Sequence, residues 1–190
     1  LGVTTDYLLG AGSSPVSMLD HSAFPYRTDE EFRSVMGAFV AEGLERSEGI
    51  LAVTTARNIE LLRDYLGADS TAVEFADAGA WYSTPTAALA AYRSFTEAAL
   101  AGDAEWVRIV AEPVWAERSS DEAQRWHRYE SLCNLVFSAS PMSLTCPYDE
   151  RSLAPEIVTD AQHTHPYTRH GPESSPNLDY TEPEHFAFQP

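Results

Sequence analysis

The sequence of 190 residues contains no lysine, and its 12 basic residues are all arginines. The missing lysine amine excludes a Walker A phosphate loop, Schiff-base chemistry and pyridoxal chemistry. Basic residues are few beside the 29 aspartates and glutamates, and the net charge is −17. A field of that sign repels nucleic-acid phosphates and anionic lipid headgroups. We therefore expect no cofactor and no direct binding to nucleic acid or membranes.

Cysteine is also scarce, since Cys133 and Cys146 are the only two. They form no CxxC pair and no disulfide framework, so the sequence does not signal a structural zinc site. No apolar run reaches the roughly 18 residues that suggest a membrane span. The start of the sequence lacks the basic region of a signal peptide. These absences predict a cytoplasmic protein with free thiols.

Helix signals recur along the chain. Thr28 with Glu31, and Ser119 with Glu122, have the S/T-x-x-E spacing of a capping box. Helices are expected from 29 into the 40s, and over 56–66, 84–102, 119–138 and 155–163. Buried strands are expected over 50–55, 71–75, 105–110 and 142–146.

The alternation of these strands and helices predicts an α/β fold. We expect three layers, with a mostly parallel sheet and helices on both faces. Residues 1–17 are Gly/Ser-rich and are interpreted as a mobile segment, and 18–166 as one domain. Five of the chain's 12 prolines fall after residue 165, so 167–190 is interpreted as a linker or tail.

Chemically distinctive residues fall where three of the expected strands end: Thr54–Asn58, Glu112–Trp115 and Cys146–Asp149. Parallel strands place their carboxyl ends at one edge, where ligands of such sheets bind. The first of these turns has neither glycine nor lysine, so it cannot cradle phosphates. The sequence therefore predicts a site at this edge without a phosphate loop.

Cys146 has several open interpretations. It could join His21, His163 or His165 around a metal, act as a nucleophile with His165 and Asp149, or pack as a small apolar residue. We expect no metal, because these histidines are distant in sequence.

The neighbouring candidates have structural alternatives as well. Glu112 could face a pocket or bond within a turn, and Trp115 could wall a pocket or cover the sheet. Glu130 and Asn134 share a helix face and either brace loops or meet a ligand. His21 and Tyr26 either fold over the sheet edge or pack.

Five ordered segments carry a family resemblance: DHSAFPYRTDEEF, AEGLERSEGILAV, VRIVAEPVWAERSSDEAQRWHRYESLCN, CPYDERSL and THP. Over about residues 18–183 the chain resembles the MEDS domain, the methanogen/methylotroph sensory domain. It is most similar to the actinobacterial branch, which normally precedes a histidine-kinase-like ATPase module of the anti-sigma type. The resemblance implies a RecA/KaiC-like α/β domain without a P-loop. One departure is Tyr129, where many relatives have a histidine before the position of Glu130.

The resemblance implies a sensory domain for small organic molecules in signal transduction and transcription control. Together with the strand-end clusters it predicts that the following residues line or brace a ligand site: His21, Tyr26, Glu112, Trp115, Tyr129, Glu130, Asn134, Cys146, Tyr148, Asp149 and His165. It also implies as partners an ATPase-type module absent from this chain, or an anti-sigma or anti-anti-sigma regulator. We expect no enzymatic activity in this chain. The alternatives are an interaction module with a degenerate site and a cysteine-dependent hydrolase.

Overall fold

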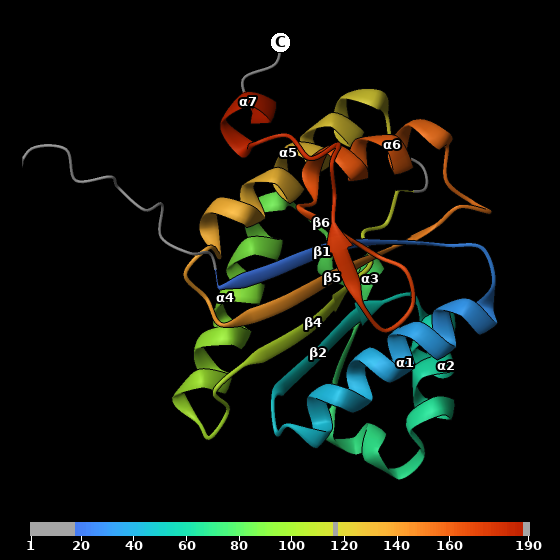
Figure 1. Ribbon diagram of the computed structural model, residues 1–190, viewed down its shortest axis with the longest axis vertical. Helices are drawn as coiled ribbons and strands as arrows, with labels where there is room; N and C mark the ends of the chain where they lie inside the picture. The colour runs from blue at the N-terminus through green and yellow to red at the C-terminus, as the bar shows by residue number, and fades with distance from the viewer. Residues whose placement is uncertain (1–17, 116–117, 188–190) are drawn as a thin grey trace, which may run out of the picture.

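A seven-stranded sheet forms the middle of the molecule in the computed structural model, which describes residues 18–115 and 118–187. The strands are β1 (Leu19–Tyr26), β2 (Gly49–Thr54), β3 (Glu74–Asp77), β4 (Val107–Ala111), β5 (Met142–Asp149), β6 (Tyr167–Arg169) and β7 (Ser174–Pro176). Their order across the sheet is β3-β2-β4-β5-β1-β6-β7 (Figure 1). All pairs are parallel except β6 with β7. The expected mobile segment 1–17 lies outside the described residues.

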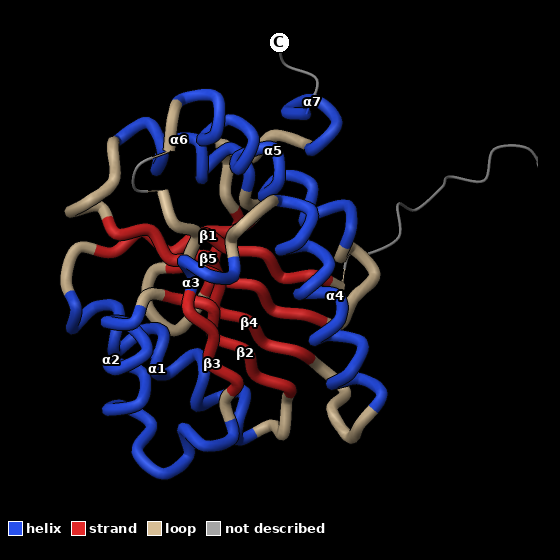
Figure 2. Tube along the Cα trace, turned by 180° about the vertical axis from the view of Figure 1, so that it is seen from behind, coloured by secondary structure: helices blue, strands red, loops and turns tan. Residues whose placement is uncertain are grey.

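Helices cover both faces of this sheet, as the alternating pattern predicted. They are α1 (Asp29–Glu45), α2 (Ala56–Leu66), α3 (Ala78–Trp81), α4 (Pro85–Ala101), α5 (Ser120–Val136), α6 (Pro155–Thr164) and α7 (Pro183–Ala187), with a 3-10 helix at Gly67–Ala72. In both views α1 and α2 lie on one side of the sheet, and α4, α5 and α6 on the other (Figures 1 and 2). The three-layer α/β prediction is therefore confirmed. Among the described helices, none is long and apolar enough to span a bilayer.

The helix ends follow the predicted signals. The Thr28 side chain accepts a hydrogen bond from the Glu31 amide at 3.0 Å, and Ser119 and Glu122 form a complete reciprocal capping box. Thr84 caps α4 directly before Pro85. Gly67 ends α2 with a φ of 58°, a left-handed conformation that glycine adopts without steric cost.

The sheet separates two hydrophobic clusters. Side chains of Ala23 and Cys146 point toward α4, α5 and α6, whereas Phe24 and Val110 point toward α1 and α2. Successive strand residues face opposite sides of a sheet, and here both sides are buried. Because both faces of the sheet are buried, the strand sequences are runs of apolar residues.

Arg108 is a charged residue inside the α1 side of the sheet, where only 5% of its side chain is exposed. Its guanidinium contacts Glu48 at 2.7 Å and Glu42 at 2.9 Å, and donates to the Phe39 carbonyl oxygen. Since buried charge is tolerated only when paired, these contacts fix the end of α1 against β4.

Two parts of the sheet were not predicted as strands. Leu19–Tyr26, which was not predicted as a strand, is β1 and lies between β5 and β6. Tyr167–Arg169 and Ser174–Pro176, interpreted as part of a linker, form a hairpin that extends the sheet beside β1. The segment after Pro166 therefore begins as part of the folded sheet, and Gly171 supplies a positive φ of 85° at its turn.

Candidate functional site

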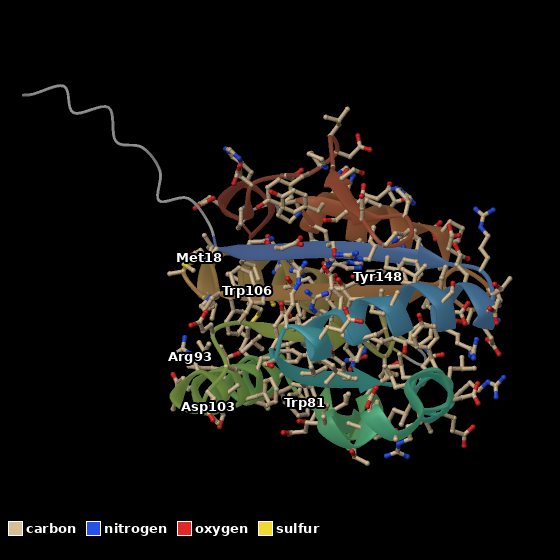
Figure 3. The ribbon with its side chains drawn as sticks, turned by 60° about the horizontal axis from the view of Figure 1, so that its bottom comes forward. Met18, Trp81, Arg93, Asp103, Trp106 and Tyr148 are labelled. Atoms are coloured by element: carbon tan, nitrogen blue, oxygen red, sulfur yellow. The ribbon has the colours of Figure 1, made fainter. Side chains whose placement is uncertain are left out.

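The three predicted clusters do meet at the carboxyl edge of the sheet. Figure 3 shows Met18 and Trp106 near the start of the strands and Tyr148 toward their other end. The sheet itself, however, divides the predicted residues between its two faces. Tyr26 and Glu112 lie on the α1 and α2 side, whereas His21, Cys146 and Tyr148 face α5 and α6.

On the α1 and α2 side, Glu112 is the centre of a buried network with Tyr26, Thr54 and Asn58. The Tyr26 hydroxyl donates to Oε1 at 2.9 Å, and Asn58 Nδ2 donates to Oε2 at 2.8 Å. Thr54 Oγ1 also donates to Oε2, and the Thr55 amide reaches it at 3.3 Å. Glu112, 6% exposed as a residue, thus receives three donors at Oε2 and one at Oε1, all from the protein.

On the opposite face, His21, Asn134, Cys146 and His165 form what we term the His21–Cys146 cluster. His21 Nδ1 lies 2.8 Å from Asn134 Oδ1, and its Nε2 lies 3.5 Å from Cys146 Sγ. The rings of His21 and His165 are 4.1 Å apart, centroid to centroid. Burial lowers the pKa of His21 to about 4 and that of His165 well below its usual value, so both imidazoles are neutral at pH 7.

Next to this cluster, the Tyr148 hydroxyl donates to Glu130 Oε1 at 2.5 Å. Burial raises the pKa of Glu130 to about 8, because the carboxylate is removed from water. Its Oε2 has no hydrogen-bond partner among the described residues. Trp115 packs against Tyr148, with ring centroids 6.2 Å apart, and Tyr129 packs against Trp126 at 5.0 Å.

The nucleophile hypothesis expected Cys146 to act with His165 and Asp149, but the structure places a different set of polar residues at the thiol. Asp149 bonds to Arg151 and is not a member of the cluster, while His21 lies between Cys146 and Asn134, so that the contacts link the residue types of a Cys-His-Asn triad. Yet burial raises the pKa of the Cys146 thiol well above its usual value. Cys146 is 4% exposed as a residue, so a polymeric substrate cannot reach its thiol.

Charged side chains border the same edge where β1 and β5 end. Arg27 contacts Glu150 at 2.6 Å, and Arg151 bridges Asp149 and Asp29. The first turn of α1 contains Asp29, Glu30 and Glu31. The three carboxylates lie in the first turn of the helix, where a helix N-terminus otherwise favours a bound anion.

A crevice of about 500 Å³ opens between these loops and α6, and we term it the switch-point crevice. It is lined by Arg27, Glu150, Arg151, Leu153, Pro155, Val158, Thr159 and Gln162. From β1 the chain crosses through α1 to β2, and from β5 it crosses through α6 to β6, on the other side of β1. Adjacent strands whose connections leave in opposite directions create the crevice in which open α/β sheets bind ligands.

None of the eleven predicted site residues lines this crevice. Tyr26 and Asp149 directly precede the lining residues Arg27 and Glu150 in the chain. The residues that sequence reasoning missed follow β1 and β5 or lie on α6. The signal that could have found them is the position of β1, since a switch point is located only when both strands are known.

A family model described as MEDS: MEthanogen/methylotroph, DcmR Sensory domain matches residues 20–166. The match begins within β1 and ends directly after His165, so it includes every residue of the His21–Cys146 cluster and of the Glu112 network. No match was found among curated proteins.

Proposed function

This chain belongs to the MEDS family of sensory domains, and from that premise we propose that it binds a small organic molecule in the switch-point crevice and regulates an attached or partner module. The observation that carries the proposal is the place of the crevice, at the carboxyl ends of β1 and β5 where their connections diverge. Its volume of about 500 Å³ falls in the usual range for small-molecule sites.

The lining of the crevice favours a small amphipathic molecule. Leu153 and Val158 offer apolar surface, and Thr159 and Gln162 of α6 offer hydrogen-bonding groups. Arg27 and Glu150 are already paired with each other. A neutral polar group can bond to this pair without separating the two charges, whereas a strongly charged ligand would have to displace one partner.

Helix α6 connects the crevice to the C-terminal segment. Gln162 lines the crevice, and its carbonyl oxygen accepts a hydrogen bond from Asn177 Nδ2. The same amide nitrogen donates to the His165 carbonyl, and the Thr181 amide donates to the His163 carbonyl. A ligand that shifts α6 therefore changes contacts that hold residues 177–181, and we propose this as the route of output.

We propose no catalytic role for the chain. Cys146 is buried and its thiol pKa is raised by that burial, conditions that oppose a nucleophilic thiolate. The regulated partner we propose is the ATPase-type module, or an anti-sigma or anti-anti-sigma protein, and transcription control is its proposed setting.

A second candidate function is a protein-interaction module with a degenerate site. The observation favouring it is that the predicted residues bond to one another in the interior. Glu112, for example, receives four donors from the protein itself. Under this interpretation the family residues only maintain the fold.

Thermal denaturation with small organic molecules separates the two candidates. The probes are short-chain alcohols, amines and carboxylic acids. At ten times Kd a ligand stabilises the fold by about 1.4 kcal/mol, which raises Tm by about 3–6 °C for a domain of this size. Thr159→Trp, which fills the crevice from an exposed position of α6, should abolish the shift.

Ala90→Trp is the matched control, because Ala90 is an exposed helical residue that lines a separate crevice along α4. It should leave the response intact. A response that survives Thr159→Trp would place the ligand elsewhere, and no response to any chemical class would favour the interaction module.

A further inference from the structure

Three metal-ligating side chains converge inside the molecule from distant parts of the chain. They are His21 of β1, Cys146 of β5 and His165, which follows α6. One ligand atom of each lies within 4.8 Å of the others, and all three residues are buried. Histidine nitrogen and cysteine sulfur are the ligands that zinc and copper(I) prefer.

Neighbouring groups hold both imidazoles with Nε2 as the free acceptor. The Ala161 carbonyl lies 2.7 Å from His165 Nδ1, and because a carbonyl only accepts, this Nδ1 carries the proton. His21 Nδ1 likewise faces Asn134 Oδ1, whose amide is oriented by donation from Nδ2 to the Thr164 carbonyl at 2.8 Å. Histidines that ligate metals are oriented by such Nδ1–H bonds.

The environment of His165 Nε2 is a second observation that points to a ligand, independent of the distances within the cluster. The residue has 0% of its surface exposed, and this nitrogen has no hydrogen-bond partner within the described ranges. An unpaired polar atom in the interior is costly, and native structures rarely keep one without a ligand or water. The nearby Glu130 Oε2 also lacks a partner in this part of the chain.

We propose that His21 Nε2, His165 Nε2 and Cys146 Sγ bind one thiophilic cation with a filled d shell, Zn²⁺ or Cu⁺. The distance from Sγ to His21 Nε2 is 3.5 Å. Bonds of about 2.3 Å to sulfur and about 2.0–2.1 Å to nitrogen, at a tetrahedral angle, separate the two ligand atoms by about 3.5 Å. The geometry of two ligands therefore matches a shared ion, and His165 is within reach of it.

Binding replaces the Cys146 S–H bond with a metal–sulfur bond and releases one proton to solvent. Three protein ligands leave a fourth position open, as in zinc sites that accept a small molecule.

This site is separate from the crevice of the proposed function, and the two can fail independently. His165 nevertheless ends α6, and its carbonyl holds Asn177, so an ion here would fix the end of the helix that lines the crevice. Metal occupancy would thus set the starting position of the output segment.

The experiment titrates the purified full chain, after chelator treatment, with Zn²⁺ and, without oxygen, with Cu⁺. One equivalent of either ion should bind and raise Tm. Co²⁺ substituted for Zn²⁺ should give a thiolate-to-metal charge-transfer band, which surface carboxylates cannot produce. Cys146→Ala should abolish this band, and Asn134→Ala should weaken Zn²⁺ affinity about 10–100-fold.

Two controls remove a thiol or an imidazole outside the cluster. Cys133→Ala deletes the other buried cysteine, and His163→Gln deletes a histidine of α6 that bonds to the Asp179 carbonyl. Both should keep the band and the affinity. Absence of binding by the folded wild type, or a Co²⁺ spectrum without a thiolate band, would overturn the proposal without reference to any variant. Thr159→Trp should leave the metal affinity unchanged.

Discussion

Replacing Glu112 tests whether the network on the α1 and α2 side braces the fold. In Glu112→Ala the hydroxyls of Tyr26 and Thr54 lose their acceptor, and the Asn58 amide loses one of its two. A buried donor without a partner costs about 1–3 kcal/mol. Tyr26 and Thr54 are 2% and 0% exposed, so water cannot replace the carboxylate without entering the core.

Because the hydroxyls of Tyr26 and Thr54 both lose their acceptor, we expect Glu112→Ala to lose about 3–5 kcal/mol of unfolding free energy. That is a large fraction of the roughly 5–15 kcal/mol by which domains are stable, and it lowers Tm by about 10 °C for a chain of this size. Glu112→Gln keeps one acceptor oxygen but turns an amide NH₂ toward existing donors, so we expect a loss of about 1–3 kcal/mol.

Urea denaturation followed by circular dichroism measures these losses. Glu97→Ala is the control, because Glu97 is an exposed carboxylate on α4 and its removal should change stability by less than about 0.5 kcal/mol. If Glu112→Ala stays within 1 kcal/mol of the wild type with an unchanged m-value, the network does not stabilise the fold and the reasoning is refuted. A folded Glu112→Gln variant should also keep any response to organic probes.

Two further expectations follow from buried or bridging side chains. Arg108→Ala leaves the Glu48 carboxylate, 7% exposed, without its partner, and should cost about 3–5 kcal/mol in the same urea assay; a loss below 1 kcal/mol would contradict the pairing. Asn177→Ala removes hydrogen bonds to the Gln162 and His165 carbonyls, and should speed amide hydrogen exchange at Thr181 while core strands stay protected. Equal exchange at Thr181 in both proteins would show that Asn177 does not hold the segment.

The sequence predicted most helices because their signals are local. Thr28, Ser119 and Pro85 each act within one helical turn, and the structure has helices beginning beside all three. Strand β1 escaped prediction because His21, Ser22 and Pro25 interrupt its apolar pattern. What makes this segment a strand is distant pairing with β5, which no local pattern reports.

The prolines of β1 and β5 show where a strand can contain a residue that has no backbone N–H to donate. Pro25 lies beyond Ala23, the last β1 residue paired with β6, and Pro147 lies beyond Thr145, the last β5 residue paired with β4. A missing amide proton is harmless where no neighbouring strand accepts it. Whether a neighbouring strand needs that proton depends on the lengths of the adjacent strands, which the sequence does not show. The prediction therefore ended this strand near Cys146, whereas β5 extends to Asp149.

The sequence located chemically distinctive residues but not their arrangement, and none of the eleven predicted residues lines the switch-point crevice. Glu112 directly follows β4 as predicted, whereas Cys146 lies within β5 and pairs with Ala23 of β1. Residue spacing does not reveal that Glu112 and Cys146 face opposite sides, because the face depends on the register of each strand. His21 and His165 also come together only through the pairing of β1 with β5 and the return of the chain after α6.

The central place of β1 has a consequence during synthesis. Ser22 and Thr145, whose hydroxyls lie 3.0 Å apart on neighbouring strands, are 123 residues apart in the chain. At the usual elongation rate of about 5–20 residues per second, the nascent β1 waits roughly 6–25 s for β5 to emerge. Its other neighbour, β6, emerges later still. Strand β1 therefore pairs only after β2, β3, β4 and β5 have been synthesised, and until then its unpaired edges are open to chaperones or to another nascent chain.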